Sequence, residues 1–259
     1  MTGKAIVSWG LPLLFLALPC AAAENLPAGS CAQPKPLTDL SHCDFSGKKL
    51  SERDLHGVKL AGAKLESTDF RKSDLSGADL RNSNAKWAKF TRATMKGADL
   101  RNADLFHAVF DEADLSGANL AGAYLFGANL IDTKAAGADF SGAYLKDILM
   151  EGIDLSGGSL RNCYTARGVF VGAKLVGTDL SGADLTGASL EEVDFSKARL
   201  KGTRLAGAVM RQAIFREADL SGATFANADV WGAKFDKARN IGPSLQEALV
   251  APFVAQERR

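Results

Sequence analysis

The sequence predicts an all-β solenoid, in which short strands and corners coil around a buried core. Large apolar residues occupy every fifth position from Leu40 to Phe235, where 37 of 40 are Leu, Phe, Met or Val. The position two residues earlier is Ala, Ser, Thr, Gly or Cys in 34 of 40 units. Neither position changes register anywhere in this span.

The five-residue period excludes the simpler regular structures. In an extended unit such as Ala113-Asp114-Leu115, the small and the large apolar residue share one face and the residue between them points outward. Because five is odd, an uninterrupted strand would turn the next apolar residue to the opposite face. An α-helix advances about 100° per residue and would scatter these residues around its surface. The chain must therefore turn in every unit.

Residues 1–23 have the pattern of a secretory signal peptide. A single charge, Lys4, precedes an apolar run that ends in Ala21-Ala22-Ala23, which supplies small residues for cleavage. The apolar centre is shorter than the roughly 20 residues of a membrane-spanning helix, which argues against an uncleaved anchor. Lipidation at Cys20 is disfavoured because Pro19 precedes it where lipoprotein signals have a small residue. We expect a periplasmic or secreted protein with no membrane insertion after cleavage.

Residues 24–37 are predicted to form an N-terminal cap or linker. Export to an oxidising compartment favours a disulfide between Cys31 and Cys43. A metal site built from these two cysteines and His42 is the alternative, but the spacing matches no zinc pattern and a fourth ligand is not evident. No metal is therefore predicted. Cys163 falls on a small inward position and is predicted to be a buried thiol.

The corners of the repeat region, residues 38–239, indicate how many units make one coil. When the fifth positions are sorted into four columns twenty residues apart, two columns hold Gly or Asn at 16 of 20 places and the other two at 8 of 20. Gly and Asn tolerate the positive φ of a type II turn, so this contrast predicts a corner geometry that recurs every twenty residues. We expect four units per coil and about ten coils.

Runs such as Ala98-Asp99-Leu100-Arg101-Asn102 and Ala113-Asp114-Leu115-Ser116-Gly117 carry the pattern A(D/N)LxG, which resembles the pentapeptide-repeat family. The resemblance covers roughly residues 38–239 and implies a right-handed quadrilateral β-helix with a stacked core. Lys48 and Arg53 depart from the pattern, because they stand at the small inward position. The first coil is therefore expected to be a partly open end.

A short capping helix is predicted within residues 240–259. Pro243 is followed by Ser244-Leu245-Gln246-Glu247, which has the form of a capping box. Leu245, Ala248 and Leu249 are predicted to make one apolar face before Pro252, where the helix is expected to end. This face would cover the end of the stack, with dimerisation through the same face as the alternative.

Charge and residue types argue against catalysis and nucleic-acid binding. The formal net charge of +1 falls to zero when Lys4 leaves with the signal peptide, so nucleic acid is an unlikely partner. The three histidines fall in different columns or distant coils, and no Ser or Cys nucleophile stands beside a base. A filled interior is expected to leave no pocket. We therefore predict a non-enzyme with no cofactor and no small-molecule substrate.

The family resemblance also implies an alternative function. Characterised members include inhibitors and protectors of DNA gyrase that look like duplex DNA through dense negative charge. The balanced charge of this chain departs from that pattern. A DNA-mimicking modulator of DNA gyrase or another topoisomerase remains the alternative prediction.

One outward feature stands apart from the mixed charged surface. Tyr124, Tyr144 and Tyr164 occupy the middle outward position at twenty-residue spacing, so they are expected to stack as a ladder. The other residues of this predicted patch are Phe106, Phe126, Trp87, Val109, Leu149 and Val169. Such a patch is typical of a protein contact, although a ladder that only stabilises stacked strands is the alternative. We predict an exported rod that binds or scaffolds another protein, or a second copy of itself, through these residues.

Overall fold

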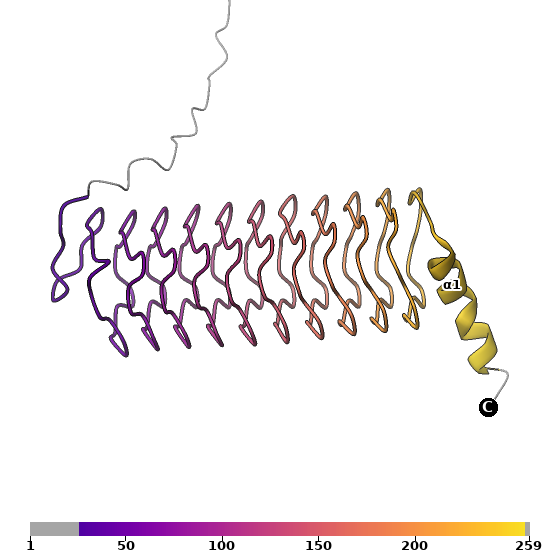
Figure 1. Ribbon diagram of the computed structural model, residues 1–259, viewed down its shortest axis with the longest axis horizontal. Helices are drawn as coiled ribbons and strands as arrows, with labels where there is room; N and C mark the ends of the chain where they lie inside the picture. The colour runs from indigo at the N-terminus through magenta and orange to yellow at the C-terminus, as the bar shows by residue number, and fades with distance from the viewer. Residues whose placement is uncertain (1–25, 257–259) are drawn as a thin grey trace, which may run out of the picture.

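The computed structural model describes residues 26–256, and the expected signal peptide, residues 1–23, lies outside them. The chain forms a rod of stacked coils with a single helix at its C-terminal end (Figure 1). Parallel bridges join residues twenty apart, from Asp39 and Lys59 to Asp219 and Arg239. They recur at every fifth residue and so make four ladders, one on each face of the rod. Each coil is therefore twenty residues long, and neighbouring coils pair by backbone hydrogen bonds.

The backbone turns in the same way at all corners. Every fifth-position residue from Gly47 to Lys237 has φ between 52° and 71°. Bulky corner residues such as Trp87 and Glu112 share this conformation with the glycines. The predicted contrast in corner geometry between glycine-rich and glycine-poor columns is thus wrong, because positive φ is required on all four faces. The twenty-residue period comes instead from the pairing of successive coils.

Large apolar side chains fill the interior of the rod. Those at the fifth positions from Leu40 to Val230 are buried, with Thr165 buried among them. Phenylalanines twenty residues apart lie on one another, with ring centroids 5.3 Å apart for Phe70 and Phe90. The small inward residues leave room inside the rod for these large side chains. Lys48 and Arg53 are exposed, so the sequence pattern and the burial break down at the same place.

The helix α1 spans Pro243–Gln256 and differs from its prediction in three ways. It begins at Pro243, so Ser244 lies inside it, and the Ser244 hydroxyl accepts a hydrogen bond from the Phe225 amide at 3.1 Å. Of the predicted apolar face, Leu245 and Ala248 are buried but Leu249 is 44% exposed. The helix continues through Pro252, because one missing amide hydrogen bond does not end it here.

Within the described residues, no helix has the length and apolar character needed to span a bilayer.

Candidate protein-interaction surface

The three tyrosines form a continuous stack on one face of the rod. Parallel bridges join Tyr124 to Tyr144 and Tyr144 to Tyr164. The ring centroids of the first pair are 5.1 Å apart with an interplanar angle of 13°, and those of the second are 5.3 Å apart at 31°. Because the rings cover one another's faces, their edges and hydroxyl groups face the solvent. Tyr124 and Tyr164 are 41% and 37% exposed.

A second row of rings runs beside the tyrosines. Phe106 and Phe126 stack at 5.6 Å, and Phe106 lies 6.3 Å from Tyr124. Trp87 meets the edge of Phe106 at 5.4 Å and is 45% exposed. The ammonium group of Lys146 lies 5.7 Å from the centre of the Phe126 ring, within cation–π range. We call the set the aromatic face: Trp87, Phe106, Tyr124, Phe126, Tyr144 and Tyr164.

The predicted aliphatic residues lie on the neighbouring ladder. Leu149 and Val169 are bridged to one another, whereas Asn129 stands between Val109 and Leu149. All three apolar side chains are half-buried. The structure thus places Leu149 and Val169 side by side and leaves Val109 two coils away from Leu149.

Most outward carboxylates support the corner that follows them, a role the sequence reasoning did not assign. Asp114 accepts a hydrogen bond from the Ser116 amide at 3.1 Å and from its hydroxyl at 2.6 Å. Asp39 accepts the same pair from Ser41, and the Ser41 hydroxyl is the main reason that the pKa of Asp39 falls to about 2. The sequence pattern that indicates this role is an aspartate followed two positions later by Ser, Thr or Arg, which is typical of an Asx turn.

Arginines neutralise many of the same carboxylates. Arg161 and Arg199 lie 3.1 Å and 3.2 Å from the Asp179 carboxylate. Arg161 comes from the preceding coil and Arg199 from the following coil. Arg204 pairs with Asp184 at 2.6 Å. The acidic residues therefore do not produce an unbroken negative surface.

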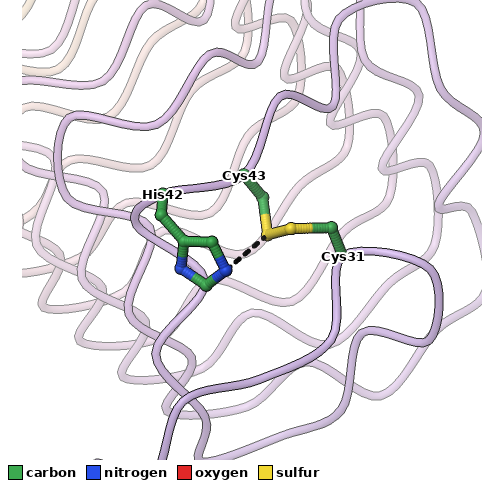
Figure 2. A group of neighbouring side chains, drawn as sticks. All are labelled: Cys31, His42 and Cys43. Carbon is green, nitrogen blue, oxygen red and sulfur yellow. Dashed lines mark hydrogen bonds between the residues drawn. A yellow bond between two sulfur atoms is a disulfide. The ribbon is translucent and has the colours of Figure 1, made fainter.

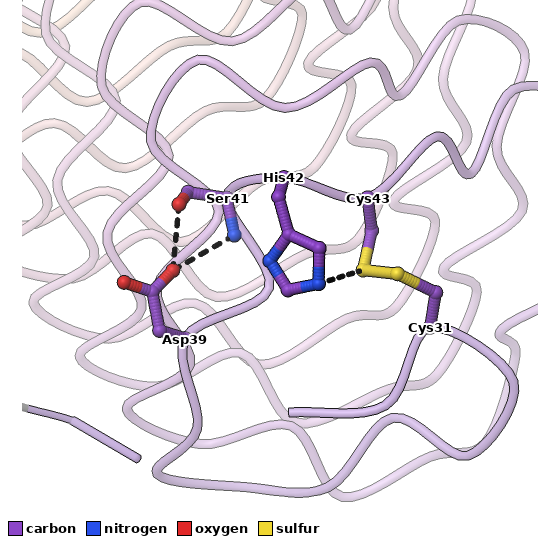
Figure 3. The surroundings of a disulfide bond; sticks show 5 residues. All are labelled: Cys31, Asp39, Ser41, His42 and Cys43. Atoms are coloured by element: carbon purple, nitrogen blue, oxygen red, sulfur yellow. Dashed lines mark hydrogen bonds between the residues drawn. A yellow bond between two sulfur atoms is a disulfide. The ribbon is translucent and has the colours of Figure 1, made fainter. Parts of the chain in front are cut away.

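A disulfide joins Cys31 to Cys43 near the N-terminal end (Figure 2), closing a segment of sequence separation 12. His42 lies beside it, with Nε2 3.7 Å from the Cys43 sulfur, and Asp39 and Ser41 come just before it in the chain, with Ser41 and His42 in the turn (Figure 3). The ligand atoms of Cys31, His42 and Cys43 lie within 4.8 Å of one another. Because the two sulfurs are bonded to each other, neither is a thiolate that could hold a metal.

Cys163 is the free cysteine of the described residues and lies in the core. Its thiol donates a hydrogen bond to the Phe140 carbonyl at 2.8 Å. Burial raises the pKa of this thiol to about 12, so it is inert rather than reactive.

Coils of twenty residues with four faces, each built from five-residue units, define a β-solenoid. A family model described as pentapeptide repeats matches this chain in 8 copies, over residues 38–71, 70–105, 86–122, 103–142, 123–162, 169–202 and 203–239. The chain belongs to the pentapeptide-repeat family, whose members fold as right-handed quadrilateral β-helices.

Solved structures of the same family resemble it. HetL, a pentapeptide repeat protein involved in heterocyst differentiation regulation in the cyanobacterium Nostoc sp. strain PCC 7120, is 28% identical with a TM-score of 0.50, over 75% of this chain and 90% of HetL. A trypsin-treated form of QnrB1, a plasmid-mediated fluoroquinolone resistance protein, is 24% identical with a TM-score of 0.33, over 81% of this chain and 94% of that one. A thylakoid-lumen protein of Arabidopsis thaliana is 25% identical with a TM-score of 0.24, over 54% and 74%. No curated protein matches.

Proposed function

We propose that this protein is an exported, non-catalytic rod that binds another protein through the aromatic face. The observation that carries the proposal is the stack of three tyrosine rings, in which Tyr124 and Tyr164 are exposed and Tyr144 between them is half-buried. Tyrosine combines a large apolar area with a hydroxyl that can hydrogen-bond, and it is enriched at protein interfaces. The coils hold the rings in place, so little side-chain freedom is lost on binding.

The geometry favours a protein over a sugar as the partner. Aromatic platforms that bind sugars need an exposed ring face for stacking. Here the two faces of Tyr144 are covered by Tyr124 and Tyr164. Edges and hydroxyl groups remain, and these suit edge-to-face and hydrogen-bonded contacts with side chains and backbone.

The surroundings of the histidines support a non-catalytic role. His56 pairs with Asp54 at 2.7 Å, His107 contacts the Gly127 carbonyl at 3.1 Å, and His42 lies beside the disulfide. Across residues 26–250, no hydroxyl or thiol nucleophile is hydrogen-bonded to any of these rings apart from the oxidised Cys43. A base without an adjacent nucleophile has no evident reaction to catalyse.

A photo-crosslinking residue at Tyr144 tests the proposal in intact cells. Lys134 is the matched control, because it occupies the outward centre of the opposite ladder at nearly the same height along the rod. We expect a specific adduct from position 144, none from position 134, and loss of the association in the triple variant Tyr124→Ser, Tyr144→Ser, Tyr164→Ser. Equal adducts from both positions contradict the proposal. An adduct with the same chain identifies a homo-oligomer instead of a second protein.

Export is tested separately by fractionation and N-terminal sequencing. We expect a mature form that begins at Glu24 outside the cytoplasm. An uncleaved cytoplasmic protein contradicts export and reopens the alternative, a DNA-mimicking gyrase modulator. That alternative needs dense negative charge, whereas carboxylates such as Asp179 and Asp184 are paired with arginines. A supercoiling assay with purified DNA gyrase is expected to show no effect.

A further inference from the structure

The N-terminal end of the rod has an open strand edge. Asp44, Lys49 and Asp54 each begin a ladder and bridge only to the next coil within the described residues. In later coils, the outward amide donates to a carbonyl of the preceding coil, as the Asp69 amide does to the Lys48 carbonyl at 2.9 Å. Among residues 26–256, the amides of Asp44, Lys49 and Asp54 have no such acceptor. The edge therefore presents backbone donors and acceptors to solvent.

The fourth face shows how such an edge can be covered. There, the Asp39 amide donates to the Pro27 carbonyl at 2.8 Å, and the Gly29 amide donates to the Asp39 carbonyl at 2.9 Å. The segment before the first coil thus pairs with this coil as an added parallel strand, and Ala28 bridges Asp39. The disulfide between Cys31 and Cys43 holds this segment in place. On the neighbouring faces, the first coil has the same arrangement of backbone amides and carbonyls, but no segment pairs with them among the described residues.

A basic pocket of about 420 Å³ adjoins the open edge, which corrects the expectation of a rod without pockets. Lys48, Lys49 and Arg53 line it together with one carboxylate, Asp44. That carboxylate already lies 3.6 Å from the ammonium group of Lys64. No carboxylate pairs with the three cations anywhere in the described part of the chain. The pocket therefore carries an excess of positive charge although the whole protein is balanced.

The two cations that break the repeat are among the residues that line this pocket. Lys48 and Arg53 replace small residues that would point into the core, and their side chains are exposed instead. Phe45 and Leu50, 2% and 7% exposed, form an apolar wall of the pocket. The repeat requires small residues at these two positions. Two long cations in their place, at the end of the rod where the strand edge is open, are better explained by a binding site.

We propose that this end binds an extended acidic peptide segment, which adds as a strand to the open edge. The amide of Lys49 donates to a peptide carbonyl on its own face of the rod, and Lys48 and Arg53, which line the same pocket, bind the peptide carboxylates. This is strand addition at a sheet edge, with the backbone supplying affinity and charged side chains supplying selectivity. The site lies apart from the aromatic face, so a test of this site does not depend on the function proposed above.

A second copy stacked end to end fits this site less well. The opposite end of the rod also carries exposed cations, Lys234, Lys237 and Arg239. The helix α1 lies across that end (Figure 1). Because Asp236 is exposed at the same end, charge alone does not decide, and the covering helix is what opposes a head-to-tail filament.

The test measures fluorescence anisotropy of a labelled, end-capped peptide of alternating Glu and Val, titrated with the full chain in its oxidised form. We expect saturable binding that a Gln-for-Glu peptide does not show. Lys48→Ser and Arg53→Ser are each expected to weaken binding about fivefold or more, since each removes a close charge pair. Both substitutions restore a residue typical of the repeat and should leave the fold intact. Lys134→Ser makes the same charge change elsewhere and is expected to change affinity less than about twofold.

A second pair of variants separates charge from strand addition. Lys49→Ser and Lys49→Pro remove the same charge, but only proline also removes the edge amide, which no ladder bond uses. We expect Lys49→Pro to bind more weakly than Lys49→Ser. Equal binding by the two, or displacement of the peptide by inorganic phosphate at equal charge concentration, identifies a simple anion site and overturns strand addition. No saturable binding up to millimolar peptide overturns the site itself.

Discussion

The hydroxyl of Thr133 donates a 2.9 Å hydrogen bond to the carbonyl oxygen of Phe110, 23 residues earlier in the preceding coil. The same carbonyl also accepts the Ala113 amide at 2.8 Å, so both of its lone pairs are used. Hydroxyl or thiol donors repeat this relationship at Thr68, Ser73, Cys163, Thr178 and Thr203. A buried hydroxyl costs free energy unless it is paired, so this acceptor explains why Thr, Ser and Cys can replace Ala at the small inward position.

Removing this bond should destabilise the protein. Thr133→Val keeps the shape of the side chain and is expected to lower the free energy of unfolding by about 1 kcal/mol. Ser83 is the counterpart, because its hydroxyl is buried with no partner in the described residues. Ser83→Ala is expected to leave stability unchanged or raise it by up to about 1 kcal/mol, since an unpaired polar group is removed. Urea unfolding measures both, and a loss of equal size in both variants contradicts the account.

The corners make a second prediction. Gly142 has φ of 67°, and an added Cβ would meet nothing within 4 Å, so Gly142→Ala tests backbone conformation alone. We expect a loss of about 1 kcal/mol. Glu192 has φ of 60° and is exposed, and Glu192→Gly is expected to gain stability by a similar amount at most. Opposite shifts of the thermal midpoint check the pair, and shifts of the same sign argue against strain at the corners.

Asp179 makes the stability of the protein depend on pH. Partial burial disfavours its charged form, but hydrogen bonds from Ser181 and from Arg161 and Arg199 outweigh burial and lower its pKa to about 2. A lowered pKa contributes stability above the ordinary value near 4, and this contribution is lost as pH falls from about 4 to about 2. Asp179→Asn is therefore expected to be less stable at pH 7 and to lose less stability on acidification. Unfolding curves at pH 7, 4 and 2 measure this, and parallel curves for the two proteins exclude the predicted role.

The disulfide is expected to act at one end only. Reducing Cys31–Cys43, or replacing both by Ser, removes a short loop constraint of about 3 kcal/mol in the chain-entropy account. Because coils contact only their neighbours, faster amide exchange should be confined to residues 26–45 and leave the central coils protected. Cys163→Ser should not reproduce this change. Cys163 should also resist thiol reagents until the protein unfolds, because it is buried with a raised pKa.

The repeat could be predicted from the sequence because one spacing determines burial, pairing and register together. Leu40 and Phe235 are the first and last of forty positions with the same spacing, and the spacing of Tyr124 and Tyr144 placed the rings on adjacent coils. The end of α1 could not be predicted in the same way, because Pro252 is a local signal and the helix continues past it despite the amide hydrogen bond that proline lacks. The basic pocket was missed because Lys48 and Arg53 appeared as defects of the repeat. Only the structure shows that they line a common space.

Every bridge that follows the first coil spans the same twenty residues, whatever the length of the rod. Each added coil therefore closes a loop of constant size, and its entropic cost does not grow with the chain. The rod can therefore become longer or shorter during evolution, because deleting or duplicating twenty residues leaves the register of all other coils unchanged. Such a change would move the aromatic face and the basic end nearer together or farther apart in steps of one strand spacing, about 4.8 Å, without altering either surface.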